Sequence, residues 1–121
     1  MVSIVICGNR SFNNYDYLKE CMDEIVKDID DDIEIVSGRA DGADTLGEKY
    51  AMEKGYGLVF YPARWEKYGK KAGPIRNKQM VDYAKDHNGM VVAFWDGKGS
   101  GTRSTINFAK RSNVPLKVFS F

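Results

Sequence analysis

Met90-Val91-Val92-Ala93-Phe94 is the most apolar run of the sequence, and the glycine-rich stretch Asp96-Gly97-Lys98-Gly99-Ser100-Gly101-Thr102 follows almost directly. A short apolar run without polar alternation is typical of a strand covered on both faces of a parallel sheet. Glycines followed by hydroxyl residues are typical of a turn that leads from a strand into a helix. We therefore predict a buried strand here, at the centre of the sheet, followed by a helix from about Thr102 to Arg111.

The rest of the chain repeats this alternation of apolar runs and amphipathic stretches. Further strands are predicted at 4–7, 33–36, 58–61 and 116–119. The last strand is expected at an edge because it contains Lys117. Helices are predicted at 18–29, from about 43 to 54, and around a first turn with Pro74. The pattern predicts an α/β fold: a doubly wound parallel sheet of about five strands with helices on both faces. A chain of 121 residues is expected to form a single domain, 1–121.

Composition narrows the range of partners. The formal net charge of +1 gives no general attraction to nucleic acid or to an anionic membrane, so we expect neither as a partner. His87 is the only histidine and no set of metal ligands recurs at a suitable spacing, so no metal site and no cofactor are predicted. Cys7 and Cys21 are interpreted as free thiols in a reducing interior. Without a leader or a stretch of bilayer length, a cytoplasmic location is expected.

The unusual residues gather after the predicted strands, in the loops 8–12, 37–44 and 96–102. The carboxyl ends of parallel strands share one edge, and a doubly wound sheet binds ligands there, where the strand order reverses. The start of the last predicted helix offers unpaired backbone N–H groups and a partial positive charge, which suit a phosphate. The structural alternative is a turn capped by Thr102. The patterns GxxxxGK[ST] and GxGxxG are both absent, which argues against a P-loop and a dinucleotide fingerprint.

Four segments resemble the SLOG superfamily, especially its YspA/cpYpsA-related branch. These are Gly8-x-Arg10-x-Phe12, Ser37-Gly38-x-Ala40-x-Gly42-Ala43-Asp44, Pro62-Ala63-x-Trp65-x-x-Tyr68-Gly69-x-x-Ala72-Gly73-Pro74-x-Arg76-Asn77-x-x-Met80 and Phe94-Trp95-Asp96-Gly97-x-x-x-Gly101-Thr102. The resemblance implies a Rossmann-like sheet that binds nucleotides or nucleotide-derived ligands, including molecules of the NAD or ADP-ribose type. Relatives include LOG-type phosphoribohydrolases, DNA-processing proteins of the Smf/DprA type, and branches thought to sense nucleotide signals in phage–host conflict.

The resemblance also permits a test of catalysis. Arg76-Asn77-Lys78-Gln79-Met80 is similar to the RKxxM segment of LOG-type enzymes, with Asn77 in place of lysine. Gly99-Ser100-Gly101-Thr102 fits part of their PGGxGTxxE segment, but Thr105 stands where the glutamate belongs. A carboxylate there would stabilise positive charge on the ribose, which threonine cannot do. Arg76 and Asp44 remain the candidate catalytic residues.

Several roles stay open for individual side chains. Arg10 and Arg76 are expected to contact phosphate or ribose, with a surface salt bridge as the alternative. Asp44 suits ribose binding, acid–base work or a helix N-terminus, and Asp96 suits a loop amide or a ribose hydroxyl. Trp65 would stack on a base or pin its loop. The full predicted ligand-binding set is Gly8, Arg10, Gly38, Gly42, Asp44, Trp65, Arg76, Asn77, Asp96, Gly97, Gly99, Ser100, Gly101 and Thr102.

Three functions follow in order of preference. The first is a sensor or carrier of a small nucleotide-derived molecule, which Thr105 favours over catalysis. The second is a hydrolase that cleaves an N-glycosidic bond of a nucleotide. The third, a DNA-processing accessory protein, is disfavoured by the near-neutral charge. Self-association as a homo-oligomer, through exposed aromatic residues such as Tyr15 or Tyr83, is left open.

Overall fold

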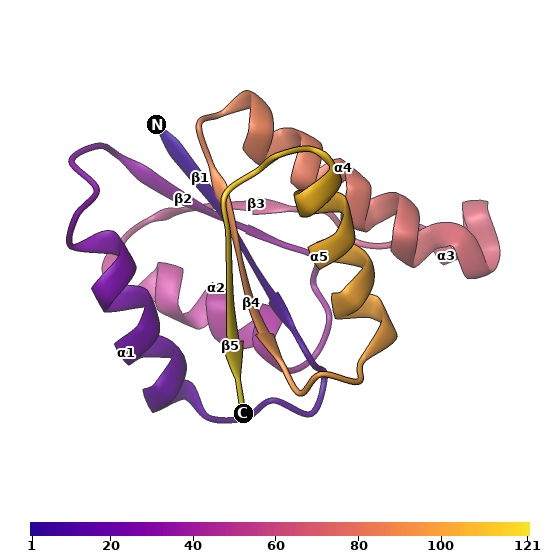
Figure 1. Ribbon diagram of the computed structural model, residues 1–121, viewed down its shortest axis with the longest axis horizontal. Coiled ribbons are helices and arrows are strands. Elements are labelled where there is room, and N and C mark those ends of the chain that lie inside the picture. The colour runs from indigo at the N-terminus through magenta and orange to yellow at the C-terminus, as the bar shows by residue number, and fades with distance from the viewer.

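The computed structural model describes residues 1–121, in which strands and helices alternate along the chain (Figure 1). The strands are β1 (Val2–Gly8), β2 (Ile33–Ser37), β3 (Gly57–Phe60), β4 (Met90–Trp95) and β5 (Leu116–Ser120). The main helices are α1 (Tyr15–Val26), α2 (Ala43–Lys54), α4 (Ala72–Asp86) and α5 (Ser100–Arg111). A short helix α3 (Trp65–Tyr68) and a 3-10 turn η1 (Gly69–Lys71) precede α4 and were not predicted.

The five strands form one parallel sheet in the order β3-β2-β1-β4-β5. This arrangement confirms the predicted doubly wound sheet, with β5 at an edge. The prediction that Met90–Phe94 lies at the centre was wrong, because β1 holds the central position. Both strands are buried on both faces, and Ile4 is as fully buried as Val91. Apolar content therefore does not reveal the order of the strands, since the edge strand β3 is itself largely apolar.

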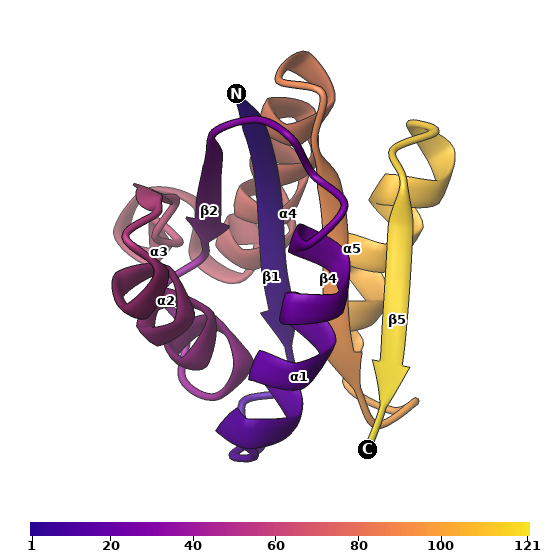
Figure 2. The same ribbon diagram turned by 90° about the vertical axis from the view of Figure 1, so that its left-hand side faces the viewer.

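The sheet separates two hydrophobic cores, and alternate residues of each strand point into opposite ones. Ile4 and Ile6 pack with Tyr50 under α1 and α2. Val5 and Cys7 pack in the second core, under α4 and α5. The views in Figures 1 and 2 agree that α1 and α2 cover one face and α4 and α5 the other. None of the helices combines the length and the apolar character that crossing a membrane requires.

The helix ends follow local sequence signals, with one exception. The Asn14 side chain caps α1 by accepting from the Tyr17 N–H at 3.0 Å. Gly55, with φ of 72°, ends α2 in the left-handed conformation, as predicted. Thr102, by contrast, is not the N-cap of the last helix. Helix α5 begins two residues earlier, and Gly99 stands at its N-cap without a capping side chain.

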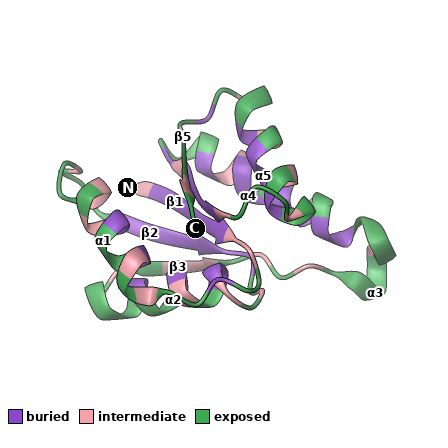
Figure 3. Cartoon of the chain, turned by 60° about the horizontal axis from the view of Figure 1, so that its bottom comes forward, coloured by how far each residue is buried: buried purple, intermediate pink, exposed green.

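Exposed residues lie in the loops, in α3 and on the outer faces of the other helices (Figure 3). Helix α3 stands away from the sheet, beyond the start of α4. Residues 61–71, which link β3 to α4, contain no fully buried residue. This segment therefore extends the carboxyl edge of the sheet beside the loop that follows β2.

Candidate functional site

Asn9 connects three loops at the carboxyl edge of the sheet through hydrogen bonds. Its N–H donates to the Phe94 carbonyl at 3.0 Å, and its carbonyl accepts from the Ala43 N–H at 3.3 Å. Its side-chain Oδ1 accepts from the Asp96 N–H at 3.0 Å. One residue thus joins the β1–α1 loop to the start of α2 and to the β4–α5 loop. Asn9 lies within the predicted loop 8–12, but the sequence analysis assigned it no role.

Two of the predicted glycines make this close approach of loops feasible. A Cβ on Gly8 would lie 2.2 Å from the Phe94 carbonyl oxygen. A Cβ on Gly42 would lie 2.3 Å from the Asn9 carbonyl oxygen, and Gly42 also has φ of 78°, which L side chains rarely adopt. Neither position can take a larger residue, because its side chain would overlap the backbone of a neighbouring loop.

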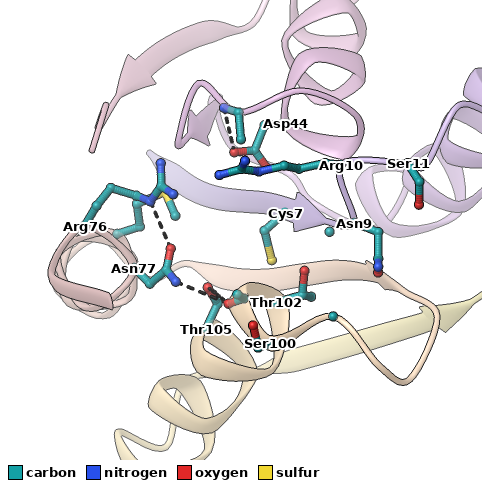
Figure 4. A pocket seen from close by; sticks show the side chains of 15 residues that line it. Cys7, Asn9, Arg10, Ser11, Asp44, Arg76, Asn77, Ser100, Thr102 and Thr105 are labelled. Carbon is teal, nitrogen blue, oxygen red and sulfur yellow. Dashed lines mark hydrogen bonds between the residues drawn. The ribbon is translucent and has the colours of Figure 1, made fainter. Parts of the chain in front are cut away.

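These loops enclose a cavity of about 480 Å³ (Figure 4). Nine predicted site residues line it: Gly8, Arg10, Asp44, Arg76, Asn77, Gly99, Ser100, Gly101 and Thr102. It is also lined by residues not in the predicted set, namely Cys7, Asn9, Ser11, Ala40, Met80 and Thr105. Gly38 and Trp65 line a second, neighbouring cavity of about 290 Å³. Gly42, Asp96 and Gly97 line neither cavity.

The first turn of α5 forms one wall of the larger cavity. Ser100, Gly101 and Thr102 are the first residues of the helix, so their N–H groups have no intrahelical acceptor. The loop before them is held by Asp96, whose carboxylate accepts from the Lys98 N–H at 2.8 Å and the Gly99 N–H at 3.0 Å. These two hydrogen bonds lower the pKa of Asp96. Asp96 thus fixes the loop and leaves the next three amides to the cavity.

Arg76 and Asn77 form a second wall, and both are buried. The Arg76 guanidinium donates to the Gly38 carbonyl and, through Nε, to Asn77 Oδ1 at 2.9 Å. Asn77 Nδ2 in turn donates to the Gly101 carbonyl at 3.2 Å. Together these hydrogen bonds link the β2–α2 loop to α5 across the cavity. Neither Arg76 nor Arg10 forms an ion pair with a carboxylate, so the surface salt bridge considered for each is absent.

Asp44 lies on the third wall, where Arg10 extends toward it (Figure 4). Its side chain is buried, and its carboxylate accepts from the Ala40 N–H at 3.2 Å. Burial raises the pKa of Asp44 to about 6, although this hydrogen bond and the positive charge of Arg76 both oppose the rise. Burial also lowers the pKa of the Arg76 guanidinium. The cavity therefore contains a carboxyl group that changes charge close to neutral pH.

The raised pKa of Asp44 predicts a pH-dependent contribution to stability. The folded chain binds this proton more tightly than the unfolded chain, whose reference pKa is 3.8, so the contribution is lost as the pH rises through about 6. Relative to Asp44→Asn, we expect the free energy of unfolding of the natural chain to increase by about 1–1.5 kcal/mol between pH 8 and pH 5. Urea titrations of both proteins across this range measure the difference. A pH-independent difference would show that Asp44 titrates normally.

Thr105 occupies the position at which the resemblance would place a glutamate. Its side chain is buried, and its hydroxyl contacts the Gly101 carbonyl at 3.5 Å. The wall beside α5 therefore carries no carboxylate, and the acidic group of the larger cavity is Asp44 on the opposite side. No group of three His, Cys, Asp or Glu side chains is close enough to hold a metal ion.

The fold and this crevice define a Rossmann-like α/β domain with its cavity at the carboxyl ends of the strands. Residues 2–68 match the profile of the YspA, cpYpsA-related SLOG family. The chain is also similar to the Gene 61 protein of Mycobacterium phage D29, with 33% identity over 90 residues that cover 70% of each chain. The chain therefore belongs to the YspA, cpYpsA-related SLOG family.

A shorter similarity connects the chain to the uncharacterized SPbeta prophage-derived protein YoqJ of Bacillus subtilis strain 168. The two are 38% identical over 47 residues, which cover 36% of this chain and 28% of YoqJ. No solved structure matches the chain. Membership of the family is consistent with a role in binding a nucleotide-related ligand, and it fixes neither the ligand nor an activity.

Proposed function

We propose that the chain binds a nucleotide or a nucleotide-derived molecule in the larger cavity and acts as a sensor or carrier of it. The observation that carries the proposal is the meeting of three kinds of anion-binding group around one space. These are the free amides at the start of α5, the guanidinium groups of Arg10 and Arg76, and the amide of Asn77. No carboxylate neutralises either arginine by a direct ion pair.

The chemistry of this arrangement suits a phosphate. Backbone N–H groups at a helix start carry partial positive charge and need no side chain to bind a phosphate oxygen. Gly101 keeps the wall open, since a Cβ at this position would meet no atom within 4 Å. A guanidinium adds paired donors that match two phosphate oxygens. The volume of about 480 Å³ falls within the range for small-molecule sites.

The remaining groups suit a ribose or a second phosphate. Asp44 and Ser11 line the same cavity and offer acceptors or donors to hydroxyl groups. We therefore include nucleoside phosphates and molecules of the NAD or ADP-ribose type among the ligands to be tested. Because the similar proteins come from a phage and a prophage, we further propose that the ligand is a nucleotide signal in phage–host conflict.

Calorimetry with purified protein tests the proposal. The probes are nucleoside mono-, di- and triphosphates, NAD and ADP-ribose, with the matching nucleosides as controls that lack phosphate. We expect at least one phosphorylated compound to bind, and its nucleoside to bind at least about tenfold more weakly, because a phosphate gains charge-assisted hydrogen bonds. Binding of nucleosides and nucleotides with equal affinity would show that the α5 start is not a phosphate site.

A second candidate function, hydrolysis of an N-glycosidic bond, is favoured by one observation. Asp44 is a buried carboxyl with a pKa of about 6 in the same cavity as Arg76, and such a group can exchange a proton near neutral pH. Mass spectrometry of the same mixtures would detect a released base. Base release that disappears in Asp44→Asn, with binding retained, would establish the enzyme. Intact ligand after long incubation supports the sensor or carrier.

A further inference from the structure

A second cavity adjoins the larger one and shares Arg10, Ala40 and Arg76 with it. Its volume is about 290 Å³, and it lies between the loop after β2 and the segment that leads into α3. Arg39, Asp41 and Trp65 line this second cavity alone. A ligand that binds its phosphate at α5 therefore has a second cavity directly beside Arg10 and Arg76 for its other end.

The walls of the second cavity offer flat surfaces. Trp65 is one of the few large apolar residues that the fold leaves exposed, at 52%. The guanidinium of Arg39 lies 4.4 Å from the centre of the Phe60 ring and donates to Glu48 Oε1 at 2.9 Å. Planar groups of these two kinds stack on nucleobases. The second cavity therefore suits the base, and the larger cavity suits the phosphate.

Arg39 is held in place by its backbone as well as by its side chain. It has φ of 66°, a left-handed conformation that is uncommon outside glycine. Its N–H donates to Ser37 Oγ at 3.1 Å, and the same hydroxyl donates to Glu48 Oε2 at 2.6 Å. Glu48 thus fixes both the turn and the guanidinium. Conformations of this kind persist where the surrounding structure enforces them, often at ligand sites.

The charged side chains that line this cavity alone are one donor, Arg39, and one acceptor, Asp41. Arg39 uses Nη1 for Glu48, and no hydrogen bond occupies its Nε or Nη2, so a fork of two parallel donors is free. The carboxylate of Asp41 is exposed, and no hydrogen bond or ion pair with another side chain occupies it. A 6-oxopurine such as guanine presents two adjacent acceptors, O6 and N7, which match such a fork. It also presents the N1–H donor, which a carboxylate accepts, whereas adenine presents an amino donor in place of O6.

We propose that the second cavity is a base subsite selective for 6-oxopurines, so that the ligand is a guanine or hypoxanthine nucleotide with its phosphate at the start of α5. Arg39 donates to O6 and N7, Asp41 accepts from N1–H, and Trp65 stacks on the ring. This inference rests on the proposed function, because it assumes that the phosphate of the ligand occupies the larger cavity.

Calorimetry on the full chain with GMP, IMP, XMP, AMP and UMP tests the subsite. We expect GMP and IMP to bind at least about tenfold more tightly than AMP or UMP, the discrimination of a bidentate arginine contact. In Arg39→Lys this preference should fall below about threefold, since lysine keeps the charge and lacks the planar fork. Arg64→Lys is the matched control, because Arg64 is exposed and lines neither cavity.

Asp41→Asn provides an independent readout at an exposed position, where the fold is not at risk. An asparagine amide can donate to the 2-oxo group of xanthine, so we expect the affinity for XMP to rise while that for GMP falls. Equal binding of GMP and AMP within about twofold overturns the base subsite and leaves the phosphate site intact. Failure of every nucleotide to bind overturns both proposals.

Discussion

Gly101→Val is expected to abolish ligand binding while leaving the fold intact. A Cβ on Gly101 meets no atom within 4 Å, and the residue lines the larger cavity, so the valine side chain fills space that a phosphate would need. We expect the affinity to fall by more than about a hundredfold, or about 3 kcal/mol. Because valine is no worse than glycine in a helix, the free energy of unfolding should change by less than about 1 kcal/mol.

Calorimetry and urea denaturation on the same preparation measure both effects. Asn107→Val is the matched control, since it places the same branched side chain on the exposed face of α5. The control should bind ligand as the natural chain does. Unchanged affinity in Gly101→Val would remove the start of α5 from the binding site.

Arg76→Met is expected to weaken phosphate binding by about a hundredfold, with a measurable loss of stability. The substitution keeps much of the side-chain volume and removes a charged donor, and charge-assisted hydrogen bonds are worth about 1.5–3 kcal/mol each. It also removes the donor to the Gly38 carbonyl and the contact with Asn77, which should lower the free energy of unfolding by about 1–3 kcal/mol.

Arg76→Lys separates charge from geometry. Lysine retains the positive charge and loses the fork that contacts Gly38 and Asn77 together, so an intermediate affinity is expected. The pH dependence gives a second readout, because Arg76 holds down the pKa of Asp44. In Arg76→Met that pKa should rise further, which NMR titration of the Asp44 carboxyl can follow. An unshifted Asp44 with undiminished phosphate binding would contradict the role given to Arg76.

The alternation of strands and helices could be predicted because each element carries its own local pattern. β1 and β4 contain continuous apolar runs, and Gly55 and Pro74 mark helix ends through their own backbone geometry. The order of strands could not be predicted in the same way. Burial on both faces makes β1 and β4 alike in composition, so the sequence analysis assigned the central position to the wrong one.

The grouping of the candidate site residues was predictable for those that line the larger cavity, and less so for those that contact one another. Arg76, Asn77 and the start of α5 stand beside one cavity, as their motifs indicated. The role of Asn9 depends on contacts with residues 43, 94 and 96, which no local pattern reveals. The short helix α3 was missed because four residues are too few to show a helical period.

The hydrogen bonds by which Asn9 connects three loops also affect the entropy cost of binding a molecule in the crevice. Loops that are already joined by hydrogen bonds before a partner arrives have little conformational freedom left to lose. Most of the favourable free energy of contact between the crevice and an incoming molecule would then appear as affinity, because little of it would be offset by the entropy cost of ordering the loops. If the hydrogen bonds of Asn9 were removed, the affinity for the molecule would fall because the loops would lose more conformational entropy on binding. This would hold even if every group that contacts the molecule stayed the same.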